Sequence, residues 1–329
     1  MKAILKKLAL LCVSIIIVLA LAEIALRLFL PVYPVGNLRT YRYDPELGAR
    51  LKPSLHEFDL TDHQEETIVN AAGTANFQTD FSGYKRIVFA VGDSYTQGTG
   101  LPADMSYPAQ LDMILNRDER GMYSKQFGVV NLGMAGTGGE QELITLDRWS
   151  QQIGEPSVIM YLGCDNDRED DLLFESGYYH RHLVDGSPTW GPLVGPLQWL
   201  TSDLQLGLRT KLLIAEMRRH GINANTPNAT ISVAEMESSI IERLREYARQ
   251  HNALLVVSWS EKGESYSWLK TWAEQNHIQF ADWAPRVDSV TTAIPDLPTE
   301  NHHSGGHHRG WVNSIIAEEY ASAIKRNLP

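Results

Sequence analysis

The 329 residues include 29 Lys and Arg against 40 Asp and Glu, a formal net charge of −11 at pH 7. This balance repels a phosphate backbone, so we expect no nucleic-acid partner. Hydrophobic residues make up 43% of the chain and charged residues 21%, which argues against wholesale disorder and against a polytopic membrane protein. The two cysteines, Cys12 and Cys164, are too few for a disulfide framework.

The N-terminus has the pattern of an export signal. Three lysines within the first seven residues precede an uncharged stretch at 8–22, and apolar residues continue to position 30. A helix over 8–30 is about 35 Å long, enough to cross a hydrocarbon core of about 30 Å. We therefore predict that residues 1–30 form a transmembrane signal anchor in the cytoplasmic membrane. By the positive-inside rule, everything after it lies on the extracytoplasmic side, periplasmic or extracellular. The alternative is a cleaved signal peptide, because Ala20-Leu21-Ala22 fits the small-x-small cleavage pattern.

The rest of the chain divides into two parts. Residues 31–83 contain four prolines and polar stretches without a sustained period of 2 or 3.6, which predicts a stalk and lead-in segment. From residue 84 to 329, short apolar runs alternate with helical patterns. The runs are Arg86–Val91, Phe127–Leu132, Pro156–Leu162, Ala253–Trp259 and Ile278–Ala281.

This alternation predicts an α/β domain with a doubly wound parallel sheet. The clearest helices begin at Ser232, which forms a capping box with Glu235, and at about Gly310. A stretch at about 168–227, rich in Trp, Tyr, Pro and Gly, interrupts the alternation and is predicted to be an insertion over the site.

Chemically active residues follow several of these strands, at the carboxyl edge where parallel sheets carry their sites. Ser94 lies in Gly-Asp-Ser-Tyr-Thr-Gln-Gly at 92–98, directly after the first strand. The second strand leads into Asn-Leu-Gly-Met-Ala-Gly at 131–136, and the third is followed by Asn166. Four histidines lie within 302–308, before the last helix.

In this order, the motifs resemble those of the SGNH (GDSL-type) hydrolase family, over roughly residues 84–325. The resemblance implies a flavodoxin-like α/β/α sandwich and a serine esterase. It implies Ser94 as nucleophile, Gly136 and Asn166 as oxyanion-hole donors, and His307 as the base. The apolar segment followed by Leu47-Gly48 is also similar to membrane-tethered members.

One departure from the family pattern concerns the histidine. The last block of the family has an Asp two or three residues before the histidine, whereas Ser304 and Gly305 stand there in this chain. Neither side chain can orient an imidazole as a carboxylate does. The remaining interpretations are a Ser-His dyad, a third role for Glu300 or for a backbone carbonyl, and a different register with His303 or His308 as the base.

A serine needs a base to become nucleophilic, and attack on an acyl carbon needs donors for the oxyanion. The favoured function is therefore an extracytoplasmic hydrolase of carboxylic acyl or acetyl esters, on a small-molecule or glycan substrate. One alternative is an O-acyltransferase acting on a cell-surface polysaccharide; another is a catalytically weak, tethered carbohydrate-binding or assembly protein. We expect no cofactor and no metal, because the histidine cluster lacks carboxylate or Cys ligands at zinc spacing.

Overall fold

The computed structural model describes residues 2–29, 40–58, 65–118, 120–175, 206, 232–301 and 306–328. The chain divides into two compact units, residues 1–35 with 187–229, and residues 36–186 with 230–329. In the first unit, helix α1 (Lys2–Phe29) coincides with the helix predicted for residues 1–30. Over the described ranges, however, no helix is both long and apolar enough to span a membrane.

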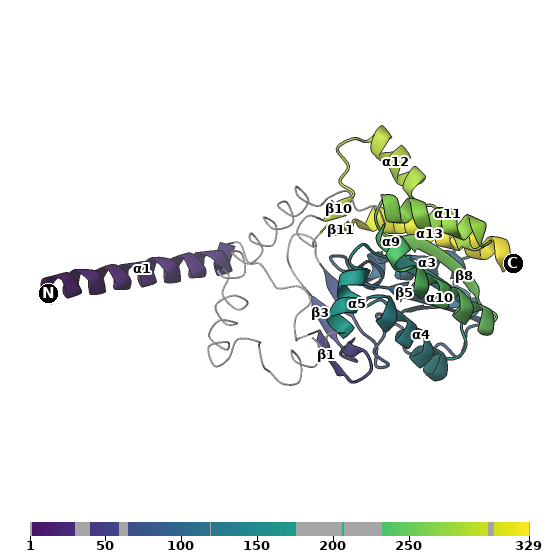
Figure 1. The fold of residues 1–329 in the computed structure, drawn as a ribbon, viewed down its shortest axis with the longest axis horizontal. Coiled ribbons are helices and arrows are strands. Elements are labelled where there is room, and N and C mark those ends of the chain that lie inside the picture. Colours follow the sequence, from purple (N-terminus) through teal and green to yellow (C-terminus); the bar gives the residue numbers. More distant parts are fainter. Residues whose placement is uncertain are drawn as a thin grey trace. The chain divides into compact units, whose positions relative to one another are not determined.

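The second unit is built on a five-stranded parallel sheet (Figure 1). Its strands are β5 (Arg86–Gly92), β6 (Phe127–Asn131), β7 (Val158–Gly163), β8 (Leu254–Trp259) and β9 (Gln279–Phe280). Their order is β6-β5-β7-β8-β9, which is a doubly wound arrangement. Every residue of β6 and β7 is buried, as expected of strands covered on both faces. The predicted α/β class and parallel sheet are confirmed.

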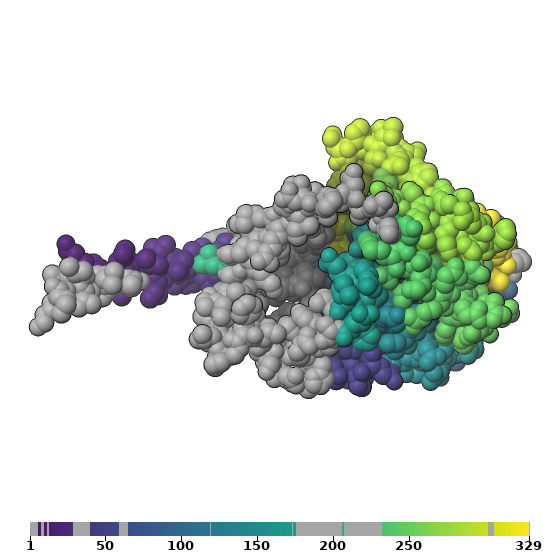
Figure 2. Space-filling view, in the orientation of Figure 1, coloured from purple at the N-terminus to yellow at the C-terminus, as the bar shows by residue number. Residues whose placement is uncertain are grey.

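Helices cover the sheet on both faces (Figure 1). α3 packs against α13, and α4 packs against α10. The helices of this unit are α2 (Ser94–Gln97), α3 (Tyr107–Asn116), α4 (Gly139–Ile153), α5 (Asp167–Glu175), α9 (Val233–Met236), α10 (Ser238–Gln250), α11 (Glu264–Gln275), α12 (Ala284–Ala293) and α13 (Gly310–Asn327), with a 3₁₀ turn η1 at Ala103–Met105. In the space-filling view, α12 projects from the surface of this unit (Figure 2).

The helix predicted from Ser232 is split in two. The Ser232 hydroxyl caps α9 by accepting the backbone N–H of Glu235 at 3.2 Å. The chain then leaves helical geometry at Glu237, and α10 begins at Ser238. Glu237 is only 2% exposed and turns toward other carboxylates, an environment that helical periodicity does not reveal.

Residues 40–58 and 65–83 differ from the predicted stalk, because they are part of the second compact unit. They form two antiparallel hairpins, β1 (Tyr41–Asp44) with β2 (Gly48–Leu51), and β3 (His56–Phe58) with β4 (Glu66–Ile68). Strands of three or four residues are too short to show a period of 2 in the sequence. Their position depends on contacts with distant residues.

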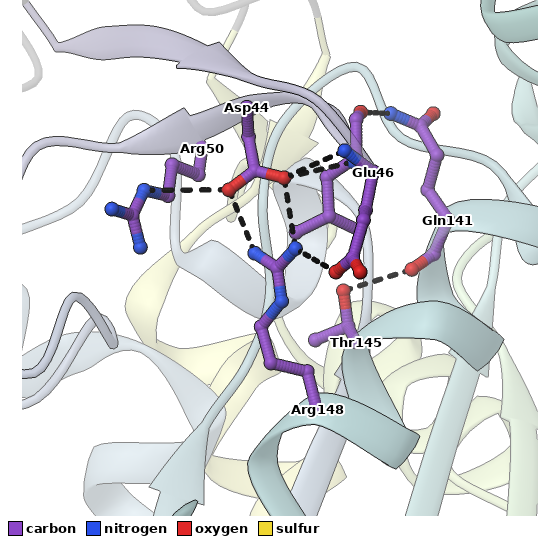
Figure 3. Close-up of polar contacts among 7 residues, drawn as sticks. Asp44, Glu46, Arg50, Gln141, Thr145 and Arg148 are labelled. Atoms are coloured by element: carbon purple, nitrogen blue, oxygen red, sulfur yellow. Dashed lines mark hydrogen bonds and ion pairs between the residues drawn. The ribbon is translucent and has the colours of Figure 1, made fainter.

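An ion pair docks the first hairpin on α4 (Figure 3). Both carboxylate oxygens of Asp44 accept hydrogen bonds from the Arg148 guanidinium at 2.8 Å, and the Leu47 carbonyl accepts the Gln141 side chain at 2.6 Å. Burial of Asp44 opposes ionisation, but the Arg148 contact and backbone N–H donors outweigh it and lower the pKa of Asp44 to about 2. This segment is part of the folded unit.

The predicted insertion at 168–227 is described only in part. Its first residues continue α5, which begins at Asp167 and ends at Glu175. Apart from position 206, residues 176–227 lie outside the described residues.

Candidate active site

A sharp turn at the end of β5 presents Ser94. Gly92 has φ +152°, and a Cβ atom there would lie 2.6 Å from the Leu162 carbonyl oxygen on β7, so the turn has room only for glycine. Asp93 caps the short helix α2 by accepting the Tyr95 N–H at 3.0 Å. Ser94, the first residue of α2, is therefore held at the carboxyl end of β5.

The pairing of two short strands near the C-terminus brings His307 to the same place. β11 (His307–His308) pairs with β10 (Glu300–Asn301), and the Asn301 amide donates to the Gly100 carbonyl at 2.9 Å. His307 Nε2 lies 2.7 Å from Ser94 Oγ, although the two residues are 213 positions apart in the chain. The fold thus joins two of the predicted site residues in a nucleophile–base contact.

The Ser94 hydroxyl also faces a carboxylate. Its Oγ lies 2.9 Å from Asp93 Oδ2, and the Asp93 side chain is fully buried. A serine hydroxyl has one hydrogen, so it can donate either to Asp93 or to His307 at any moment. Donation to His307 Nε2 is the arrangement that activates the oxygen for attack, and it requires the neutral imidazole with its hydrogen on Nδ1.

The neighbouring histidine occupies a different environment. His308 Nε2 lies 2.6 Å from the Ser260 carbonyl oxygen, which can only accept, so this ring nitrogen donates. Burial lowers the pKa of His308 to about 4. The geometry therefore favours His307 over His308 as the base. His303 and Ser304 lie outside the described residues, and Glu300 stands on β10 facing Gly306.

Gln97, the last residue of α2, holds the predicted motif at 131–136 against the helix that carries Ser94. Gly133 packs so tightly on α2 that a Cβ atom would lie 2.3 Å from the Gln97 backbone nitrogen. The Gln97 side-chain oxygen accepts the Ala135 N–H at 2.8 Å, one residue before Gly136. Gly136 has φ +77°, a left-handed conformation that suits glycine. Sequence reasoning missed Gln97, whose only signal is its position three residues after Ser94.

Asn166 is held by its neighbours in the loop after β7. Its side-chain nitrogen donates to Asp170 at 2.6 Å, and its oxygen lies 2.7 Å from Cys164 Sγ. An amide nitrogen carries two hydrogens, and the oxyanion role predicted for Asn166 requires the second one. Burial raises the pKa of Asp170 to about 6.

A group of buried acids surrounds this site, and the sequence analysis did not anticipate it. Glu142 and Asp167 are 2% and 0% exposed, and burial followed by the charges of neighbouring carboxylates raises the pKa of both well above the usual range. Both carboxyl groups therefore hold their proton to higher pH than an exposed carboxyl group does. In the part of the chain that the structure describes, no cluster of His, Cys, Asp or Glu is placed to hold a metal ion.

No family model matches the sequence, and no curated protein does. Solved structures show the following similarities. A member of the lipolytic protein G-D-S-L family from Veillonella parvula is 10% identical over 73% of this chain and 98% of its own, with a TM-score of 0.42. A GDSL-like lipase from Bacteroides thetaiotaomicron is 12% identical over 74% and 89%, with a TM-score of 0.36. A family two carbohydrate esterase from Clostridium thermocellum, in complex with cellohexaose, is 11% identical over 83% and 70%, with a TM-score of 0.34.

Proposed function

We propose that this protein is a serine hydrolase of carboxylic acyl esters, with Ser94 as nucleophile and His307 as general base. The observation that carries the proposal is the 2.7 Å contact between Ser94 Oγ and His307 Nε2 at the carboxyl edge of the sheet. Nucleophile and base within hydrogen-bond distance are the core of acyl-transfer sites on unrelated folds.

We infer the reaction from this contact and from the oxyanion-hole roles that the resemblance implies for Gly136 and Asn166. His307 takes the Ser94 proton as Oγ attacks the acyl carbon, and the oxyanion that forms is stabilised by the Gly136 N–H and the Asn166 amide. His307 then donates that proton to the departing alcohol, which leaves an acyl-Ser94 intermediate. Water, deprotonated by His307, releases the acid and restores the serine. We propose a small-molecule or glycan acyl ester as substrate.

Substitution of Ser94 tests the proposal. Ser94→Ala should lower turnover of a chromogenic acetyl ester by at least about 10³-fold and abolish labelling by a fluorophosphonate probe. His307→Ala should have a comparable effect on turnover. Ser267→Ala, an exposed serine on α11, serves as the matched control and should leave both readouts unchanged. Labelling that survives in Ser94→Ala would contradict the assignment. Acetyl transfer to an added glycan, in place of free acetate, would contradict hydrolysis.

We further propose that the apolar segment within residues 1–30 retains the enzyme on the outer face of the cytoplasmic membrane. This part of the proposal rests on the sequence, in which lysines precede the uncharged stretch at 8–22. In intact cells, an added protease should reach the domain only from the extracytoplasmic side, and carbonate washing should leave it bound. A soluble protein that begins near Glu23 would instead show that the segment is a cleaved signal.

A further inference from the structure

The side chain of Tyr95 extends from α2, the helix that carries Ser94, to β11, the strand that carries His307. Its ring centroid is 4.7 Å from that of His307 and 5.0 Å from that of His308, and the residue is only 8% exposed. Because Tyr95 directly follows Ser94 on α2, this ring is a packed contact between the element that carries the nucleophile and the element that carries the base. The position of the Tyr95 ring therefore influences the orientation of His307.

The Tyr95 hydroxyl fixes that ring at its far end. It lies 3.2 Å from Glu261 Oε1 and 3.5 Å from the carbonyl oxygen of Gly306, the residue before His307. A phenol has one hydrogen, and the carboxylate is both the nearer acceptor and the stronger one. Glu261 is thus the main anchor of the Tyr95 ring.

The loop that carries Glu261 also holds His308, the second histidine of β11. Ser260 and Glu261 directly follow β8, and the Ser260 carbonyl accepts from His308 Nε2 at 2.6 Å. The loop after β8 therefore contacts the histidine strand twice, directly through Ser260 and indirectly through Glu261 and Tyr95. This loop follows β8, which β7 separates from β5 in the sheet, and its two contacts hold the histidine strand beside Ser94.

Other groups fix Glu261 in turn. Although the residue as a whole is exposed, its carboxyl group lies against Tyr95 and close to Asp165, which itself accepts the Trp259 indole N–H at 2.8 Å. Burial of the carboxyl group and the neighbouring Asp165 raise the pKa of Glu261 to about 7. The adjacent Lys262 is engaged by Asp288 in an ion pair.

We propose that Glu261 is a positioning residue for His307 and acts through the hydroxyl and ring of Tyr95. The inference rests on the proposed esterase function. The chain has no Asp two or three residues before His307, where a carboxylate would orient the imidazole directly. The Glu261–Tyr95 contact orients the ring by packing, keeping Nε2 directed at Ser94 Oγ.

Kinetics of four variants and one control variant test the proposal. Tyr95→Phe keeps the ring but loses the hydroxyl, and Glu261→Ala loses the acceptor. Each should lower kcat about tenfold while KM stays within about twofold, and the double variant should be no slower than either single one. Glu261→Gln keeps an acceptor oxygen and should retain more than half of kcat. Glu264→Gln changes an exposed residue in the first turn of α11; this variant is the control and should not change kcat.

Two results would overturn the inference: kcat within twofold of wild type in Tyr95→Phe, or single effects that multiply to about 100-fold in the double variant. A readout that needs no substrate separates failure of this inference from failure of the esterase proposal. The NMR signal of the His307 Cε1–H, assigned with His307→Gln, should shift in Tyr95→Phe and Glu261→Ala but not in Glu264→Gln. An unmoved signal in a folded Tyr95→Phe protein refutes the positioning role even if no ester is ever hydrolysed. A shifted signal in a protein without esterase activity supports positioning and refutes only the proposed function.

Discussion

Glu142 offers the sharpest test of how the buried acids affect stability. It lies on α4 and is 2% exposed, and neither of its carboxyl oxygens has a hydrogen-bond partner among the described residues. Burial, followed by the charges of Asp93, Asp171 and Glu237, raises its pKa well above the usual range. The folded protein therefore keeps a proton on Glu142 that the unfolded chain releases above about pH 4.3.

The sign and size of the effect follow from proton linkage. An acid with a raised pKa in the folded state contributes full stability below its unfolded pKa, and that contribution falls as pH rises toward the folded pKa. While the folded state holds one extra proton, the free energy of unfolding decreases by about 1.4 kcal/mol per pH unit. Glu142→Gln removes this proton, and its amide can donate to the surrounding carboxylates. We expect the variant to be more stable than wild type near pH 7 and the difference to shrink toward pH 5.

Urea unfolding of the purified protein, followed by tryptophan fluorescence from about pH 5 to pH 7, measures this directly. The slope of unfolding free energy against pH should be less negative in Glu142→Gln by about 1.4 kcal/mol per unit. Asp147→Asn changes an exposed acid on the same helix and should leave the slope as in wild type. Equal slopes in wild type and Glu142→Gln would refute the assignment of a buried neutral carboxyl.

Two further substitutions test the architecture around the site. Arg148→Ala leaves the largely buried Asp44 carboxylate with only the longer Arg50 contact at 3.5 Å, so unfolding free energy should fall by about 2–3 kcal/mol. Limited proteolysis should then cleave the first hairpin, and unchanged protease resistance would contradict the docking role. Gly133→Ala forces a methyl group against the Gln97 backbone and should lower kcat about 10²-fold at unchanged far-ultraviolet circular dichroism. Gly263→Ala, where a Cβ atom meets nothing within 4 Å, should leave kcat as it is.

The sequence predicted the elements whose identity depends on near neighbours in the chain. Continuous apolar runs marked all five strands of the sheet, since a strand buried on both faces needs apolar side chains at every position. The glycines around Ser94 indicated a tight turn after the first strand for the same local reason. The predicted strand bounds lie within one or two residues of the observed ones, because each apolar run ends where its strand leaves the buried sheet.

The tertiary structure alone decided which distant side chains meet. The family resemblance pointed to His307, but only the pairing of β11 decides that His307 faces Ser94 while His308 faces the Ser260 carbonyl. The predicted stalk proved to contain a docked hairpin, because its hold on α4 comes from Arg148, over a hundred positions away from Asp44. Contacts of this kind are set by packing between elements, which periodicity and local motifs do not encode.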